Sequence, residues 1–258
     1  MKQSLHGKRV LITRDKKQAG PFAEKIEQAN GEPVMSDLLT IDCMCDEKSE
    51  ETLQAANQYD WLFFTSANGV ECFFKKHSDV SEDKLENIRI GVVGSKTEAV
   101  LKTYGYEADF MPQIFNAKTM AKEFMDQHPT HESVLLVQGK RSRMELGDAF
   151  IAEGRPFSRV TLYETKTNQA AREPLNDILE NRLPDFITFM SPSTVEAFVA
   201  LRETSFREHQ PVIVCIGTTT QRRALNLGFQ NTIVPETFTI EGMIEAMCEY
   251  IEVEEGGQ

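Results

Sequence analysis

Short apolar runs alternate with segments of helical spacing along most of the chain. Runs of four or five apolar and β-branched residues, bounded by polar ones, predict strands buried on both faces, as in a parallel sheet. The predicted strands cover residues 10–13, 61–64, 90–93, 134–137, 186–189 and 212–216. Apolar positions three and four apart follow the runs, as in residues 19–26, and predict helices. The pattern is typical of repeated βα units.

The first half of the chain recurs in the second half in the same order. Residues 59–71 resemble residues 184–196, and residues 90–97 resemble 213–220. A third pair joins residues 8–14 to 132–138, and the offsets stay between 123 and 125 residues. The repeat predicts an α/β fold with two doubly wound, flavodoxin-like parallel sheets.

Small polar residues follow four of the predicted strands. They occupy positions 65–68, 94–97, 191–194 and 217–220. Ligands of open parallel sheets bind at the carboxyl ends of the strands, and helix starts there attract carboxylate or phosphate groups. The same residues are also ordinary helix caps. The repeated motifs favour a two-lobed binder of an anionic small molecule, with a cleft expected between the halves.

Composition narrows the class of protein. The chain has 258 residues, 40% of them hydrophobic, and 28 Lys and Arg against 40 Asp and Glu, a formal net charge of −12. This balance argues against nucleic acid or an anionic membrane as the main partner. No apolar run approaches about 18 residues, so no membrane span is expected. The five cysteines are odd in number and form no C-x-x-C pair, which indicates a reducing compartment and a cytoplasmic protein.

Other chemical signals are weak. The basic stretch 139–143 follows a strand, where it would assist anion binding or form a solvated loop. The Walker, G-x-G-x-x-G and G-x-S-x-G spacings are missing, and the histidines lack ligand spacing, so no metal site is expected. Cys72 and Cys215 lie in apolar runs, which predicts core thiols.

Seven short motifs occur in an order that resembles the uroporphyrinogen-III synthase family over about residues 7–251. They are Val-Leu-Ile-Thr-Arg at 10–14, Phe-Thr-Ser-Ala-Asn at 64–68, Val-Gly-Ser-Lys-Thr at 93–97, Leu-Tyr-Glu-Thr at 162–165, Phe-Met-Ser-Pro-Ser at 189–193, Cys-Ile-Gly-Thr-Thr at 215–219 and Phe-Thr-Ile-Glu-Gly at 238–242. The resemblance implies two α/β domains joined by a two-stranded β-ladder. The implied domains are 1–34 with 170–258, and 46–155, with linker strands at 35–45 and 156–169.

The resemblance also implies an activity. The substrate would be hydroxymethylbilane, a linear tetrapyrrole with acetate and propionate groups, which the enzyme closes with inversion of ring D and loss of water through a spiro intermediate. No cofactor or metal is expected. A monomer is expected, with transient hand-over of the bilane from the preceding bilane-forming enzyme.

Site residues follow from the same resemblance. Tyr163 is the expected general acid, although it could instead pack on the linker ladder; its counterpart in the repeat is Thr40, so it breaks the internal symmetry. Asp15 follows Arg14 where the family commonly has proline. The expected substrate-binding residues are Arg14, Ser66, Asn68, Thr97, Arg141, Arg143, Ser191, Ser193, Thr219 and Thr220.

Two alternatives belong to other classes. A non-catalytic two-lobed sensor of a tetrapyrrole or another polyanion would keep the polar strand ends but would not need Tyr163. A flavodoxin-like electron carrier is a weaker alternative, because the chain predicts two lobes and lacks flavin-loop signals.

Overall fold

The chain folds into two compact α/β units. The computed structural model describes residues 4–76, 85, 87–128, 131–142, 144–203 and 210–256. Unit 1 consists of Met1–Thr40 and Lys166–Gln258, and unit 2 of Ile41–Thr165. Among the described residues, no helix is long and apolar enough to cross a membrane.

Unit 1 is built on a five-stranded sheet in the order β10-β9-β8-β1-β2. Neighbouring strands of this sheet pair in parallel. Its strands are β1 (Arg9–Ile12), β2 (Glu32–Met35), β8 (Phe186–Phe189), β9 (Val212–Cys215) and β10 (Thr232–Ile233). Its helices are α1 (Lys16–Gln28), α8 (Arg172–Asn181), α9 (Pro192–Leu201), α10 (Thr218–Asn226) and α11 (Ile240–Gly256), with a 3₁₀ turn at Gln169–Ala171.

Unit 2 is built on a second five-stranded sheet, in the order β3-β7-β6-β4-β5. Its strands are β3 (Leu39–Cys43), β4 (Trp61–Phe64), β5 (Arg89–Val92), β6 (Val134–Gly139) and β7 (Phe157–Thr167). Its helices are α2 (Glu47–Gln54), α3 (Ala67–Lys76), α5 (Ser95–Thr103), α6 (Ala117–Gln127) and α7 (Glu145–Ala152), with a 3₁₀ turn at Ala56–Gln58. Phe110 makes an isolated parallel bridge to Gly91 beyond β5.

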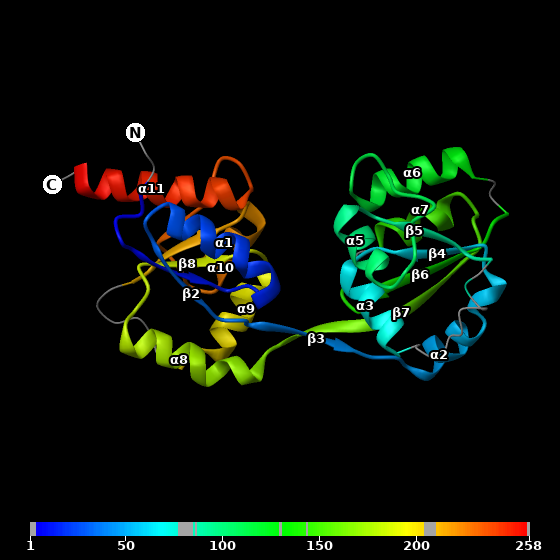
Figure 1. Ribbon diagram of the computed structural model, residues 1–258, viewed down its shortest axis with the longest axis horizontal. Helices are drawn as coiled ribbons and strands as arrows, with labels where there is room; N and C mark the ends of the chain where they lie inside the picture. Colours follow the sequence, from blue (N-terminus) through cyan, green and yellow to red (C-terminus); the bar gives the residue numbers. More distant parts are fainter. Residues whose placement is uncertain are drawn as a thin grey trace. The chain divides into compact units, whose positions relative to one another are not determined.

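Alternating side chains on the strands explain the three layers. In β1, Val10 and Ile12 join a core with α1 and α11, whereas Leu11 joins a core with α8, α9 and α10. Figure 1 shows α1 and α11 on one face of this sheet and α8 and α9 on the other. Unit 2 divides in the same way, with Leu62 and Phe64 on the face of α3 and Trp61 and Phe63 on the face of α6 and α7. The fold confirms the prediction of two parallel-sheet α/β domains.

The internal repeat and the two units do not coincide. Strands β1 and β2 correspond in sequence to β6 and β7, and β4 and β5 correspond to β8 and β9. Unit 1 contains β1 and β2 from the first repeat and β8 and β9 from the second, whereas unit 2 contains β6 and β7 with β4 and β5. The two repeats have therefore exchanged their first βαβ segments.

The chain passes between the units twice, along β3 and β7. The backbone nitrogen of Met44 donates to the carbonyl of Leu162 at 2.9 Å, and that of Asn168 donates to the carbonyl of Leu38 at 2.9 Å. Residue numbers rise along one strand as they fall along the other, so the two strands are antiparallel.

The structure corrects the prediction for Cys72. Its side chain is buried, as expected, but it is not a thiol: Cys72 of α3 forms a disulfide with Cys43 of β3. Sequence reasoning considered only the apolar surroundings of Cys72, and nothing in those surroundings identifies a partner 29 residues away. The bond ties β3, through α3, to the core of unit 2.

Reduction of this disulfide should destabilise unit 2. Closing a loop of 29 residues removes conformational entropy from the unfolded chain, and such bonds contribute about 2–4 kcal/mol. Trp61 is the only tryptophan and lies buried in unit 2, so its fluorescence reports on that unit. We expect the urea midpoint followed by this signal to fall with dithiothreitol. Cys45→Ser should keep the dependence on reductant, because Cys45 is outside the disulfide; equal midpoints in both conditions would contradict the assignment.

Candidate functional site

The predicted site residues lie where the strands of each sheet end. In unit 1, Arg14 follows β1, Ser191 and Ser193 follow β8, and Thr219 and Thr220 follow β9. The parallel register aligns Ile12 with Thr188 and Phe189 with Cys215, so these strand ends form one edge. In unit 2, Ser66, Asn68, Thr97 and Arg141 follow β4, β5 and β6, and Tyr163 lies within β7. Arg143 lies outside the described residues.

Ser191 and Ser66 begin helices in the two units. The Ser191 hydroxyl accepts a hydrogen bond from the Thr194 backbone nitrogen at 3.3 Å, and the Thr194 hydroxyl accepts one from the Ser191 nitrogen at 3.2 Å, a complete capping box. Ser66 accepts from the backbone nitrogen of Gly69 at 3.1 Å. Both serines are therefore helix caps. Ser193 lies 2.9 Å from the Ser191 hydroxyl, so this helix start presents a pair of linked hydroxyls.

Gly94 and Gly217 begin the helices α5 and α10 in equivalent positions. The buried side chains here are Thr97 and Thr220, only 4% and 3% exposed, and their backbone nitrogens donate to the carbonyls of Gly94 and Gly217. The exposed residues of these first turns are Ser95, Lys96, Thr218 and Thr219. Sequence reasoning singled out Thr219 but missed the other three, which the same strand-end motifs contain.

Tyr163 lies at a β-bulge between β6 and β7. The pairing steps from Gln138 with Thr161 to Gly139 with Tyr163, which leaves Leu162 as the extra residue. Leu162 and Tyr163 consequently contact the same core, although consecutive residues of a regular strand point to opposite faces. The Tyr163 ring covers Gly139: a Cβ on that glycine would lie 2.5 Å from the ring.

The phenol of Tyr163 meets the start of α3. Its Oη lies 2.8 Å from Oγ of Ser66, the cap of that helix. Both side chains are half-buried, so the phenol is held without being closed off from solvent. If the phenol loses its proton, Ser66 can donate to the phenolate, and the positive end of the α3 dipole favours the negative charge. This arrangement suits a proton donor.

The remaining candidates differ in exposure. Arg14 and Asn68 are half-buried, and Arg141 is exposed. Lys140, beside Arg141, forms an ion pair with Glu164 at 3.1 Å, which offsets its charge next to Tyr163. Hydroxyl groups and helix starts therefore contribute much of the polar character of these edges.

The two buried cysteines outside the disulfide, Cys215 and Cys248, offer no nucleophile. Burial raises the pKa of the Cys215 thiol to about 12, so it remains protonated at neutral pH. Cys248 is also buried, and its pKa is raised by burial and by neighbouring glutamates. The complete burial of Cys215 in the core of unit 1 confirms it as a core thiol. In the ranges that the structure describes, no group of three His, Cys, Asp or Glu side chains could hold a metal ion.

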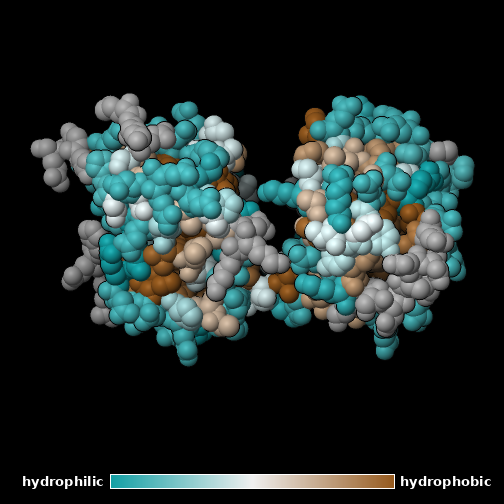
Figure 2. Space-filling model, viewed as in Figure 1, coloured by the Kyte–Doolittle hydropathy of each residue, from teal (hydrophilic) through white to brown (hydrophobic). Residues whose placement is uncertain are grey.

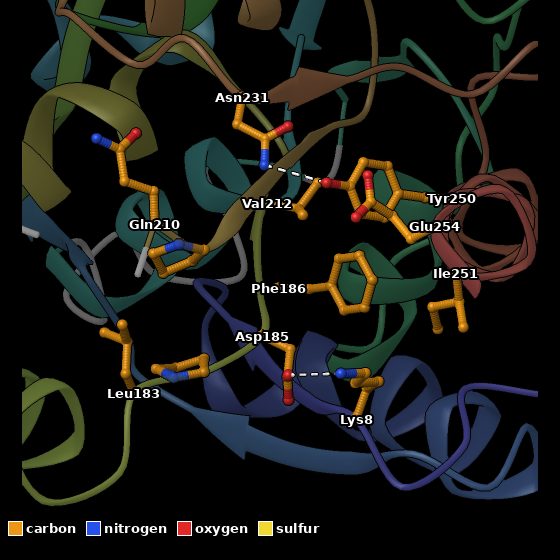
Figure 3. Close-up of a pocket in the computed structure, with 12 residues that line it drawn as sticks. Lys8, Leu183, Asp185, Phe186, Gln210, Val212, Asn231, Tyr250, Ile251 and Glu254 are labelled. Atoms are coloured by element: carbon orange, nitrogen blue, oxygen red, sulfur yellow. Dashed lines mark hydrogen bonds and ion pairs between the residues drawn. The ribbon is translucent and has the colours of Figure 1, made fainter. Parts of the chain in front are cut away.

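A cavity of about 360 Å³ lies at the opposite edge of the unit 1 sheet, where the strands begin (Figure 3). Lys8 is the single cation among its described lining residues and pairs with Asp185 at 3.2 Å. The Asn231 amide donates to the Tyr250 hydroxyl at 3.3 Å. None of the predicted site residues that the structure describes lines this cavity.

Comparisons with known proteins agree on one family. The family model described as uroporphyrinogen-III synthase HemD matches residues 20–245. The porphyrin biosynthesis protein HemD of Ruminiclostridium josui is 31% identical over 96% of the chain, which spans 50% of that protein. The uroporphyrinogen-III synthase of Chlorobaculum parvum is 26% identical over 94% of the chain and 98% of its own length.

Solved structures of low sequence identity share the fold. The uroporphyrinogen-III synthetase of Helicobacter pylori superposes with a TM-score of 0.63 at 17% identity, covering 94% of this chain and 99% of that one. A mutant uroporphyrinogen III synthase of Thermus thermophilus gives a TM-score of 0.57 at 16% identity, covering 95% and 99%.

Gly139→Ala should displace Tyr163. The new methyl group would lie 2.5 Å from the ring, so the ring must move and the bond to Ser66 should be lost. We expect a crystal structure of the variant to show a separated Ser66–Tyr163 pair, with a loss of about 1–3 kcal/mol in stability from overpacking. Gly147→Ala is the matched control in unit 2, because its Cβ would meet Phe157 at an ordinary 3.4 Å. An unmoved Tyr163 ring would refute the role of Gly139.

Proposed function

The chain belongs to the uroporphyrinogen-III synthase family, whose members are hydro-lyases of tetrapyrrole biosynthesis, and we propose that it closes hydroxymethylbilane to uroporphyrinogen III. In this proposal Tyr163 is the proton donor. One observation carries the assignment of the acid: the Tyr163 phenol is bonded to the cap of a helix, 2.8 Å from Ser66. A phenol carries an O–H group that can donate its proton to a leaving group within hydrogen-bond reach.

The reaction begins with the loss of a poor leaving group. The hydroxyl on ring A departs as water once it has received a proton, and the ring becomes an azafulvenium cation. Ring D attacks this cation through its substituted carbon to form a spiro intermediate. The bond from that carbon to its original methylene then breaks, which inverts ring D.

Closure completes the proton balance. The free α-carbon of ring D bonds to the released methylene and loses its proton as the pyrrole is restored. That proton returns to the phenolate of Tyr163, so one molecule of hydroxymethylbilane gives one uroporphyrinogen III and one water. Between the two transfers, the phenolate is stabilised by a hydrogen bond from Ser66 and by the start of α3.

Binding is assigned to the strand-end residues. The carboxylates would meet exposed or half-buried groups at the helix starts and beside them, while the buried Thr97 and Thr220 support the first turns of α5 and α10. Ser66 acts mainly through Tyr163 in this proposal. The described groups assigned to the carboxylates are Arg14, Asn68, Arg141, Ser191, Ser193 and Thr219. Arg143 is assigned with them on the sequence alone.

Amide and hydroxyl donors suit the charge of the chain. The chain has a formal net charge of −12, so a polyanionic substrate needs a local positive potential at its binding site. Helix starts provide this potential without added lysines. Hydrophilic residues cover most of the face of each unit drawn in Figure 2. The hydroxymethylbilane substrate, the cytoplasmic location, the monomeric state and the hand-over of the bilane stay predictions.

The activity itself is directly testable. Supplied with hydroxymethylbilane generated in the assay, the purified chain should yield uroporphyrinogen III, identified by chromatography of the oxidised porphyrins. A heat-denatured sample supplies the spontaneous background. Formation of the type I isomer alone, at the background rate, would reject the enzyme and leave the sensor alternative, which binds a tetrapyrrole without converting it.

Replacement of the acid tests its role separately. Tyr163→Phe should lower kcat about 10²-fold or more, because general acid catalysis contributes about 10²–10⁴-fold, while KM changes little. Tyr104→Phe is the matched control, since that ring stacks on Phe74 in the core of unit 2, away from Ser66. Unchanged turnover in Tyr163→Phe would show that water or a substrate carboxylic acid protonates the leaving group.

A further inference from the structure

Two phenylalanines stand exposed at equivalent positions of the two units. Phe115 is 56% exposed in unit 2 and Phe238 is 59% exposed in unit 1. They are 123 residues apart, the same offset that separates Gly94 from Gly217. Each therefore belongs to the internal repeat.

Their backbones have the same local structure. The Asn116 nitrogen donates to the carbonyl of Ile114 at 2.7 Å, and the Thr239 nitrogen donates to that of Thr237 at 2.7 Å. Each phenylalanine is thus the central residue of a three-residue turn. A helix starts directly afterwards, α6 at Ala117 and α11 at Ile240. The backbone that carries each ring therefore has the same local form in the two units.

Each ring lies over the glycine that begins a strand-end helix. A Cβ on Gly94 would lie 2.9 Å from the Phe115 ring, and one on Gly217 would lie 3.6 Å from the Phe238 ring. The two rings therefore stand beside α5 and α10, at the carboxyl edges of their sheets. These are the edges at which the substrate-binding residues are assigned.

The duplication distinguishes these rings from other exposed apolar residues. A single exposed hydrophobic side chain is common and needs no explanation. Leu225, for example, is 48% exposed on α10, but its counterpart in the repeat is Lys102. An aromatic ring occurs in both copies, in the same kind of turn and over equivalent glycines, although most of its surface is in water.

We propose that Phe115 and Phe238 are substrate contacts, each ring packing against the face of a pyrrole whose carboxylate arms reach the adjacent polar residues. The inference rests on the proposed function. Pyrrole rings of the bilane are flat, apolar on their faces and charged only at their substituents, so they match a flat ring bordered by hydrogen-bond donors. Offset aromatic pairs are favoured beyond the area that they bury. The two rings would orient pyrroles that the carboxylate contacts alone would leave free to rotate.

The test measures kcat and KM for hydroxymethylbilane in Phe115→Ala, Phe238→Ala and the double variant. Each single change should raise KM about 3- to 10-fold, and the double variant by about the product, with kcat within about 2-fold. Phe115→Tyr and Phe238→Tyr keep the flat ring and should retain the original KM. Leu225→Ala, which removes an exposed apolar side chain from α10, should leave both kcat and KM unchanged.

Thermal unfolding separates a substrate contact from a packing role. Alanine variants that lose thermal stability but keep the original KM would overturn the proposal, and so would tyrosine variants that fail to restore KM. The proposed function is judged on the unmodified chain in the same assay. If that chain forms uroporphyrinogen III while the alanine variants match its KM, only the aromatic contacts are refuted; if it forms none, both proposals fall.

Discussion

The parallel pairing of β7 with β6 is the constraint on which the rest of the structure depends. It places an 11-residue strand between β6 and β3, and the end of this strand, from Lys166 to Thr167, belongs to unit 1. It also contains the bulge that turns Tyr163 over Gly139 and toward Ser66. A regular register would place Tyr163 on the opposite face, because the side-chain period of a strand is two. One irregular step thus connects the architecture to the chemistry.

Much of the fold could be predicted from the sequence, since strands buried on both faces leave strong local signals. The predicted strand at 61–64 matches β4, and that at 186–189 matches β8. The repeat also indicated which strands are equivalent. The repeat alone could not indicate the exchange of βαβ segments between the units, because a strand can pair with either copy of its neighbour without any change in its own hydrophobic pattern. The family resemblance predicted the exchange.

The site was harder to predict because its contacts join residues that are distant in the chain. Ser66 and Tyr163 are 97 residues apart, and the glycine beneath the phenol belongs to a stretch noted only for its basic charge. The position of Thr97 and Thr220 in their motifs predicted them as substrate contacts. In the structure each is the third residue of its helix and its side chain is buried, which a short motif does not reveal. The partner of Cys72 was missed for the same reason.

The exchange of segments between the repeats has a consequence for how the gene can be divided. Unit 2 is one continuous stretch, and its ends, Ile41 and Thr165, lie on the paired strands β3 and β7. In genetic terms it is an insertion into unit 1, and a short connection from Thr40 to Lys166 could replace it. A cut at the boundary of the repeats, near residue 130, would instead give two fragments that each contain strands of both sheets and complete neither.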